Sequence, residues 1–431
     1  MKFDWWLTGF CSSRAFTGIV FMTYSAALSV LQNEWAMSAT AAGSIASAFH
    51  IGYASSLVIF SVLADRTGPK PLYLGSISAG AFFSLVFALF ARNYLSALIL
   101  YTLVAVSLGG TYTTGLMVLA DQYPIQRRGK AIGLFIASTS LGYALSLLLS
   151  GFALPIGGYK LSFLLTCLGP LLGSIVAWIT LYKTHVSSVQ RTEGHRFTSE
   201  VLRNKPAMLF ITGYTFHTWE LLGMWAWTPA FLSACLIMGG SEGLRAAGLG
   251  SYITASFHFT ALFASFSMGA LSDRLGRARV ILMISSISSL CSFLFGWSIG
   301  WPLILVMGIG LIYAFSALGD SPVLSAALTE VVETPYLGAA FGLRSFLGFG
   351  AGAVASLAFG AVLDWTNAVS LGGTAYSTWG WAYSVLGLGG VGAVAAAYIA
   401  VSISKQGNND SLRESQSPSS TNQYTSIDTM P

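Results

Sequence analysis

Charged residues are scarce in this chain: of its 431 residues, only 9% are Asp, Glu, Lys or Arg, whereas about 25% are charged in an ordinary soluble domain. Hydrophobic residues make up 54% of the sequence. So few charges are not enough to keep a folded chain of this size in water. The composition therefore excludes a soluble globular protein and indicates one whose surface is mostly in contact with lipid.

Cysteine is also rare, and the signs of catalytic chemistry are missing. The four cysteines stand singly in apolar segments, with neither the spacing of metal ligands nor a disulfide pattern. The sequence has no zinc motif H-E-x-x-H, no phosphate loop G-x-x-x-x-G-K and no nucleophile elbow G-x-S-x-G in a plausible place. We therefore expect no catalytic residue, no metal and no cofactor, and a protein that is not an enzyme.

Long apolar stretches account for most of the sequence. A helix needs about 20 apolar residues to cross a hydrocarbon core of about 30 Å, and polar breaks divide the chain into twelve such stretches. The first of them lacks a cleavage site of small residues, so we expect it to be retained. The predicted spans are 10–31, 40–64, 72–91, 95–119, 130–153, 161–182, 207–231, 249–271, 280–299, 302–327, 338–362 and 378–403.

The longest internal polar segment divides the chain near its middle. We therefore expect an all-α membrane protein with twelve transmembrane helices in two six-helix bundles. The C-terminal residues are rich in Ser, Thr, Asn and Gln, and they cannot bury enough apolar surface to offset their ordering entropy. The predicted parts are a first bundle (1–182), a cytoplasmic linker (183–206), a second bundle (207–403) and a disordered cytoplasmic tail (404–431).

The basic residues are distributed unevenly over the predicted loops. Sixteen Lys and Arg residues lie on the side of the N-terminus, and three, Arg92, Lys160 and Arg245, lie on the other side. Cytoplasmic loops concentrate Lys and Arg, so we expect both termini in the cytoplasm and a plasma membrane, specifically a bacterial inner membrane. The net charge of +5 then follows from topology and requires no nucleic acid.

A short motif occurs twice, after the second and the eighth predicted span. Asp65 and Asp273 are 273 minus 65, or 208, positions apart, and Gly129 and Gly338 are 209 positions apart at the starts of the fifth and eleventh spans. Two independent landmarks thus give one register for two similar halves. The first copy contains Asp65, Arg66, Gly68 and Lys70, and the second contains Gly269, Asp273, Arg274, Gly276, Arg277 and Arg279.

The motif Gly-x-x-x-Asp-Arg-x-Gly-Arg-x-Arg resembles the signature loop of the major facilitator superfamily of transporters, and the resemblance extends over all twelve spans. The second copy is complete, whereas the first has Ser61 at the initial Gly and Pro69 at a basic position. Segment 138–146 lacks the Gly-Pro pair typical of the drug/proton antiporters of that family. The resemblance therefore favours the branches that handle organic acids, cyanate or nitrate.

The resemblance also implies a gating role for the motif. In this family the loop Asp is thought to lie beside the N-terminus of a helix of the opposite half, which implies Asp65 near the eleventh span and Asp273 near the fifth. The helix dipole and unpaired amides favour a carboxylate there by about 0.3 to 1 kcal/mol. Alternatively, the basic residues only set the topology. The candidate gating residues are Asp65, Arg66, Gly68, Asp273, Arg274, Gly276 and Arg277.

Ionisable residues inside the predicted spans are few, and each costs at least about 2.5 to 3.5 kcal/mol at mid-helix, which makes it a functional candidate. His50 and His258 are again 208 positions apart, so we expect them to flank a central cavity as repeat-related residues. The alternative is that each only bonds a neighbouring helix. The complete set is Arg14, His50, His217, Glu220, His258, Asp320 and Arg344.

The seventh span carries several of these candidates. His217 and Glu220 are three positions apart and share a helix face, so the pair is a candidate for proton coupling or else a structural hydrogen bond. Asp320 precedes Pro322, and it either pairs with Arg344 or carries a proton. Trp225 and the nearby Trp227 belong either to the aromatic belt at the membrane surface, which we favour, or to a stacking platform.

Two arginines and three histidines face only two carboxylates in the predicted membrane interior. An anion would supply the missing charge, so we predict a monomeric, proton-coupled symporter of a small organic or inorganic anion. The substrate candidates are Arg14, His50, His258 and Arg344, with His217, Glu220 and Asp320 for the proton. The arginines could instead extend to the membrane surface. Other readings are an exporter of an amphipathic or cationic compound, a membrane enzyme and a sensor.

Overall fold

The computed structural model describes residues 4–186, 198–333, 336–367 and 376–416, and within these ranges a few side chains, including that of Asp65, are not described. Every regular element in the described ranges is helical. The first half contains α1 (Trp5–Gly18), α2 (Thr23–Glu34), α3 (Ala39–Thr67), α4 (Pro69–Phe90), α5 (Tyr94–Gln122) and α6 (Ile125–Leu181). The second half contains α7 (Lys205–Met238), α8 (Gly243–Leu275), α9 (Arg277–Phe295), α10 (Leu303–Val331), α11 (Leu337–Thr366) and α12 (Gly380–Gln416).

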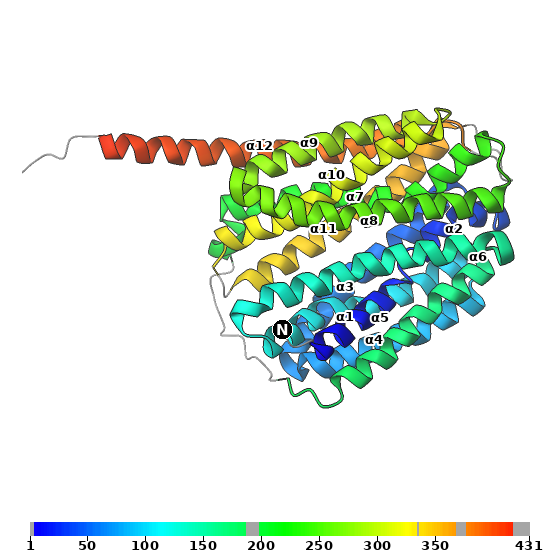
Figure 1. Cartoon of the computed structure of the whole chain (residues 1–431), viewed down its shortest axis with the longest axis horizontal. Helices are drawn as coiled ribbons and strands as arrows, with labels where there is room; N and C mark the ends of the chain where they lie inside the picture. Colours follow the sequence, from blue (N-terminus) through cyan, green and yellow to red (C-terminus); the bar gives the residue numbers. More distant parts are fainter. Residues whose placement is uncertain (1–3, 187–197, 334–335, 368–375, 417–431) are drawn as a thin grey trace, which may run out of the picture.

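The predicted number of membrane crossings is confirmed. Ten segments of the described chain are long and apolar enough to cross a membrane, and α1 and α2 together form one of them. Another, Arg127–Leu181, has 55 residues and breaks at Gly157 and Gly158, where φ of Gly158 is 61°, a value that favours glycine. It therefore crosses twice. The more polar α8 runs beside the others along the bundle (Figure 1), which brings the total to twelve.

Local sequence explains where several helices begin. The Ser38 side chain accepts a hydrogen bond from the amide of Ala41 at the start of α3. Asn93 and Ser96 form a capping box at the start of α5. Such caps satisfy amides that have no partner inside the helix. They fix the ends of helices whose length is set by the membrane.

The helices form two bundles that pack along a common axis (Figure 1). Within the first half α1 packs on α6 and α4 on α5, and within the second half α7 packs on α11 and α12. The two halves meet where α3 packs on α11 and α6 on α8. The first of these seams is tight, because a Cβ added to Gly43 would lie 2.5 Å from the carbonyl oxygen of Ser356. A glycine is needed there for the helices to approach each other.

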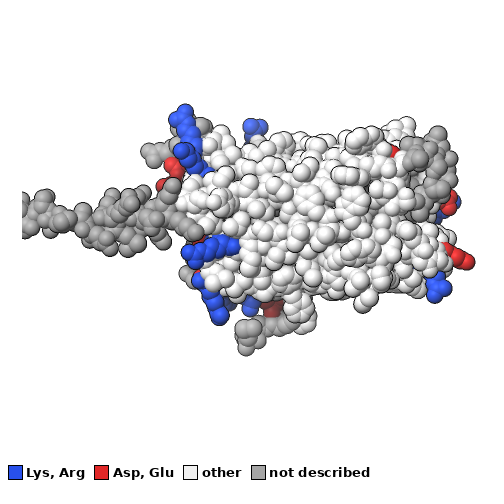
Figure 2. Space-filling view, turned by 90° about the horizontal axis from the view of Figure 1, so that it is seen from above, with Lys and Arg blue, Asp and Glu red and all other residues white. Residues whose placement is uncertain are grey.

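On the face drawn in Figure 2, the exposed charged side chains lie towards the two ends of the molecule. Figure 2 shows a broad uncharged middle, with most Lys and Arg side chains at the end from which α12 projects. We call this end, where α3 and α8 finish, the basic end. The opposite end shows fewer basic side chains on the face drawn. This arrangement matches a protein whose middle lies in lipid.

The segments assigned to the linker and the tail are partly described. A π-helical turn, Thr198–Leu202, precedes α7, and residues 187–197 lie outside the described ranges. The helix α12 continues to Gln416, beyond residue 403, where we expected the last span to end. An existing helix extends at little cost, because the nucleation step is already made. Residues 417–431 of the predicted tail also lie outside the described ranges.

Candidate functional site

Arg14 of α1 is buried inside the first half, with 2% of its surface exposed. Its Nε donates to Thr139 Oγ1 over 2.8 Å, and its Nη1 donates to Thr111 Oγ1 over 2.9 Å. The guanidinium carbon lies 5.5 Å from the ring centroid of Tyr112 and 5.3 Å from that of Phe135. The side chain therefore points into the bundle and does not extend to the membrane surface. Among the described residues no carboxylate pairs with it.

Arg344 of α11 has similar surroundings in the second half. It is 6% exposed, and its Nη1 donates to Ser325 Oγ over 2.7 Å. The guanidinium carbon lies 4.1 Å from the ring centroid of Tyr214 and 4.6 Å from that of Phe341. Its Nε has no hydrogen-bond partner among the described residues. Both arginines are thus held by hydroxyl groups and aromatic rings, without a neutralising carboxylate in the described part of the chain.

The internal repeat relates the two arginine sites. Subtracting 209 from Arg344 gives Phe135, which lies against Arg14, and subtracting 208 from Asp320 gives Tyr112, which also lies against Arg14. The two charges therefore occupy equivalent corners of the halves. They come from different helices: Arg14 belongs to the first helix of its half, whereas Arg344 belongs to the fifth crossing of its own.

A layer of tyrosines connects the two corners. Arg14 is within electrostatic range of Tyr53 and Tyr143. Tyr112 is within electrostatic range of both arginines and of Tyr214. None of these tyrosines stands out in the sequence, because a tyrosine in an apolar span costs little free energy and gives no signal. Their tertiary position makes them the walls between two buried cations.

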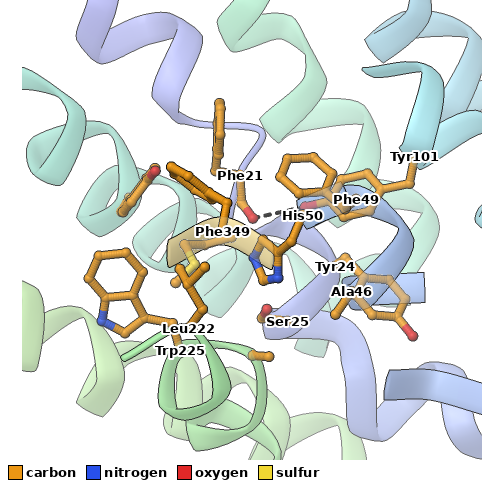
Figure 3. A pocket seen from close by; sticks show the side chains of 13 residues that line it. Phe21, Tyr24, Ser25, Ala46, Phe49, His50, Tyr101, Leu222, Trp225 and Phe349 are labelled. Atoms are coloured by element: carbon orange, nitrogen blue, oxygen red, sulfur yellow. Dashed lines mark hydrogen bonds between the residues drawn. The ribbon is translucent and has the colours of Figure 1, made fainter. Parts of the chain in front are cut away.

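A cavity of about 40 Å³ lies next to this layer, between the halves (Figure 3). Its walls are mostly aromatic, and they come from both halves. Tyr143 lines the cavity and is also within electrostatic range of Arg14. The cavity is lined by Phe21, Met22, Tyr24, Ser25, Ala46, Phe49, His50, Tyr101, Tyr143, Leu222, Trp225, Ala226 and Phe349.

The repeat-related histidines have different environments. The Nδ1 atoms of His50 and His258 are both buried without a partner among the described residues, but only His50 lines the cavity. His258 is behind the wall: its ring centroid lies 5.2 Å from that of Trp225 and 5.9 Å from that of Tyr143. Both of those residues line the cavity, whereas His258 does not.

The assignment of the two tryptophans to the membrane surface was wrong. Trp225 lines the central cavity. Trp227 is fully buried and stacks on Phe359, with ring centroids 4.9 Å apart, and its Nε1 donates to the carbonyl oxygen of Ser356. The helix α7 extends to Met238, so both residues lie deeper than the predicted end of this span suggested.

The acidic residues of the second half pair differently from the sequence pattern. His217 Nδ1 lies 2.8 Å from Asp320 Oδ1, and both side chains are 3% exposed. Glu220 points to another neighbour, and its Oε1 accepts a hydrogen bond from Ser288 Oγ over 2.9 Å. The sequence spacing places His217 and Glu220 on one face of α7, but the carboxylate that pairs with His217 is that of Asp320 in α10. Asp320 thus pairs with His217 and not with Arg344.

The two motif copies have the same backbone geometry. Gly68 and Gly276 link consecutive helices with φ of 84° and 90°, values that favour glycine. Asp273 lies 2.5 Å from Arg277 and is 64% exposed, and Arg277 also pairs with Glu330. Asp273 is therefore engaged within its own half in this conformation. The side chain of Asp65 lies outside the described part, and both Arg66 and Arg274 are exposed.

The hydrogen bonds that we find between the halves, within the described residues, all lie at the end opposite the basic end. Asp364, near the end of α11, accepts from the amides of Ala39 and Thr40 over 2.8 and 2.7 Å and from the Thr40 hydroxyl over 2.6 Å. Tyr376 also donates to Asp364 over 3.1 Å. The carboxylate thus caps α3 of the other half. We did not single out Asp364 from the sequence, because an acidic residue at the end of a span resembles any polar break.

A model of the Major Facilitator Superfamily matches residues 10–249. These 240 residues are more than half of the chain of 431. The chain belongs to the Major Facilitator Superfamily. Its fold also resembles that of a solved D-xylose-proton symporter, which superposes with a TM-score of 0.71 at 16% identity, covering 92% of this chain and 97% of that one.

Curated superfamily members with similar sequences are transporters. The chain is 27% identical over 364 residues to a gallate transporter of Pseudomonas putida, covering 78% of this chain and 80% of that protein. It is 25% identical over 310 residues to a probable 4-methylmuconolactone transporter of Cupriavidus pinatubonensis, covering 67% and 68%. This superfamily member is therefore a multi-pass membrane transporter of small molecules and not an enzyme.

Proposed function

We propose that this protein is a secondary active transporter that moves a small organic carboxylate through the membrane by alternating access, together with a proton. The observation that carries this proposal is the pair of buried arginines, Arg14 and Arg344, without carboxylate partners in the described chain. Charges in hydrocarbon are costly. A bound anion would offset that cost, and the two guanidinium groups can hold a carboxylate through paired N–H donors.

The surroundings of the arginines favour an organic anion with a flat ring over an inorganic one. Aromatic residues cover both guanidinium groups and most of the adjoining cavity. Such walls stack well on rings and offer few hydrogen bonds to a small hydrated ion. Gallate, which names one relative, is an aromatic carboxylate. These features together support a ring-bearing carboxylic acid as the substrate.

The proton is assigned to the second half. His217 and Asp320 form a buried pair, and Glu220 lies on the same helix as His217, one turn further on. In such a pair the addition or loss of a proton changes the local charge by one unit, which is costly in low dielectric unless a neighbour compensates. An anion arriving at Arg344 of the same half would supply that compensation. Substrate and proton binding are then coupled.

The conformation and the charge distribution complete the proposal. Asp364 and its partners close the end opposite the basic end, so this state would exchange substrate at the basic end. We place that end and both termini in the cytoplasm of a bacterial cell, by the excess of Lys and Arg there, and expect a monomer. Export of a cation is less well supported, since Glu220 and Asp320 bond to Ser288 and His217.

Uptake into proteoliposomes tests this function directly. Purified protein should carry radiolabelled gallate inward, faster with an acidic outside, and the Arg14→Met variant should not. Its matched control is Lys160→Met, which removes an exposed cation just after the break in α6 at Gly157 and Gly158, outside the site. Uptake at the same rate with and without a pH gradient would show that transport is not coupled to protons. Uptake of organic cations but not of carboxylates would overturn it.

A further inference from the structure

We propose that His50 recognises a hydroxyl group on the ring of the substrate, at the end remote from its carboxylate, and that it thereby sets which ring acids are transported. This inference rests on the proposed function, since the carboxylate is taken to bind at the arginines. The cavity beside the tyrosine layer is then the second place at which the substrate is recognised. The substrate class becomes hydroxylated ring carboxylic acids.

The cavity lies close to both arginines. Phe349 lines it and lies five residues beyond Arg344 in α11, which is about 7.5 Å further from the basic end at 1.5 Å per residue. The Phe349 ring lies 5.0 Å from that of Tyr53, which in turn interacts with Arg14. The cavity is therefore about one ring away from both guanidinium groups. A ring acid held by its carboxylate would extend towards it.

The walls of the cavity offer few polar groups that are free to bind a ligand. The hydroxyls of Tyr24 and Tyr101 are already used, because they donate to the carbonyl oxygens of Ala42 and Phe21. His50 differs: its Nδ1 is buried and has no partner among the described residues. Figure 3 shows the imidazole in the middle of the aromatic walls, with the Ser25 side chain beside it. The Nε1 of Trp225, another lining residue, is also buried without a partner among the described residues. An indole N–H can only donate, whereas a neutral imidazole offers both a donor and an acceptor.

A ring hydroxyl is chemically complementary to His50 and Ser25. A neutral imidazole carries one donor and one acceptor nitrogen, and a serine hydroxyl can do both. A ring hydroxyl also donates and accepts, so it can satisfy His50 whichever nitrogen carries the proton. A methyl group or a bare ring edge would leave the buried nitrogen unpaired, which native proteins avoid. The volume of about 40 Å³ exceeds what one water molecule needs.

The repeat provides a matched control inside the same chain. His258 is the repeat mate of His50, but Trp225 and Tyr143 separate it from the cavity, and it is 3% exposed. Both histidines follow a phenylalanine in a transmembrane helix. Changing one or the other removes the same chemical group at equivalent depth. Only the change at His50 should alter recognition of a hydroxyl.

The test compares binding of benzoate and 4-hydroxybenzoate by titration calorimetry with the purified full-length protein. In the native protein the hydroxyl should improve Kd about tenfold, the usual scale for one added buried hydrogen bond. His50→Phe should abolish that gain while still binding benzoate, and His50→Gln, which keeps a donor and an acceptor, should restore part of it. His258→Phe should keep the full gain.

Each outcome bears on one proposal. If His50→Phe keeps the tenfold preference, or if His258→Phe loses it equally, the assignment of His50 is wrong although the carboxylate site stands. If the native protein binds neither acid, the proposed function fails and this inference fails with it. Melting temperatures of the variants show whether a loss of both ligands reflects misfolding. In that case the partial rescue by His50→Gln decides.

Discussion

The two halves of this transporter share a fold and a repeat register, yet their polar interiors differ. The first half holds Arg14 among hydroxyls and aromatic rings, with no acidic partner in the described part of the chain. The second half holds Arg344 together with the His217–Asp320 pair and Glu220. The two halves thus share their helix arrangement through the repeat, whereas the residues that we expect to bind substrate and proton differ between them. We propose that the first half provides a permanent positive charge, Arg14, and that the second half provides the groups that take up and release a proton.

Removing the fixed charge of the first half should have the largest effect. Arg14→Met deletes a charge-assisted interaction with the substrate carboxylate, worth about 1.5 to 3 kcal/mol, or about 10- to 150-fold in Kd. Arg14→Lys should keep part of the affinity, because it keeps the charge but loses the planar donors. Binding of benzoate by calorimetry measures both. Equal affinity of the native protein and Arg14→Met would contradict the proposed division between the halves.

Removing the acid of the second half should have a different kind of effect. Asp320→Asn leaves His217 without a carboxylate, so proton movement should no longer follow substrate movement. We expect uptake driven by a pH gradient to fall to the level of the gradient-free control, while exchange of labelled for unlabelled substrate continues. Both rates are measured in the same proteoliposomes. Gradient-driven uptake that survives in Asp320→Asn would show that the proton is carried elsewhere.

A third, smaller effect is expected where the halves touch. Asp364→Asn replaces a carboxylate that accepts three hydrogen bonds from Ala39 and Thr40, and it should cost about 1 kcal/mol, or about a fivefold shift towards opening of that end. A cysteine placed at Ser233, which is fully buried beside this seam, should react faster with an impermeant thiol reagent.

The control for this change is Glu242→Gln, which neutralises an acidic residue at the start of α8 whose side chain makes no capping hydrogen bond. Its labelling rate should match that of the unmodified background. If Asp364→Asn and Glu242→Gln label at the same rate, then the carboxylate of Asp364 does not hold the end closed.

The smallest effect is expected at the motif of the second half. Asp273 pairs with Arg277 within its own half and is 64% exposed, and exposed ion pairs contribute at most about 1 kcal/mol. Asp273→Asn should therefore shift the melting temperature by only about a few degrees or less. The predicted latch to the start of α6 would act in the alternative conformation. Unchanged cysteine accessibility on both faces in this variant would rule out such a latch.

The sequence was sufficient for the fold, because the physics of the bilayer fixes helix length and the repeat fixes the register. Six of the ionisable residues singled out from the sequence are buried in the structure, namely Arg14, His217, Glu220, His258, Asp320 and Arg344. They stand out in the sequence because a charge in lipid is costly. Their partners were not predictable. The pairing of His217 with Asp320 and the closure by Asp364 join helices far apart in sequence, and the tyrosine layer carries no charge that would mark it.

The most direct measurement of the central claim is a thermal-shift comparison of three ligands of similar shape: benzoate, benzamide and benzylamine. A ligand that binds only the folded state raises its stability. The account predicts that benzoate raises the melting temperature of the native protein, that benzamide and benzylamine do not, and that the rise disappears in Arg14→Met. Stabilisation by benzylamine, or equal stabilisation by benzamide, would contradict a site built around two uncompensated arginines.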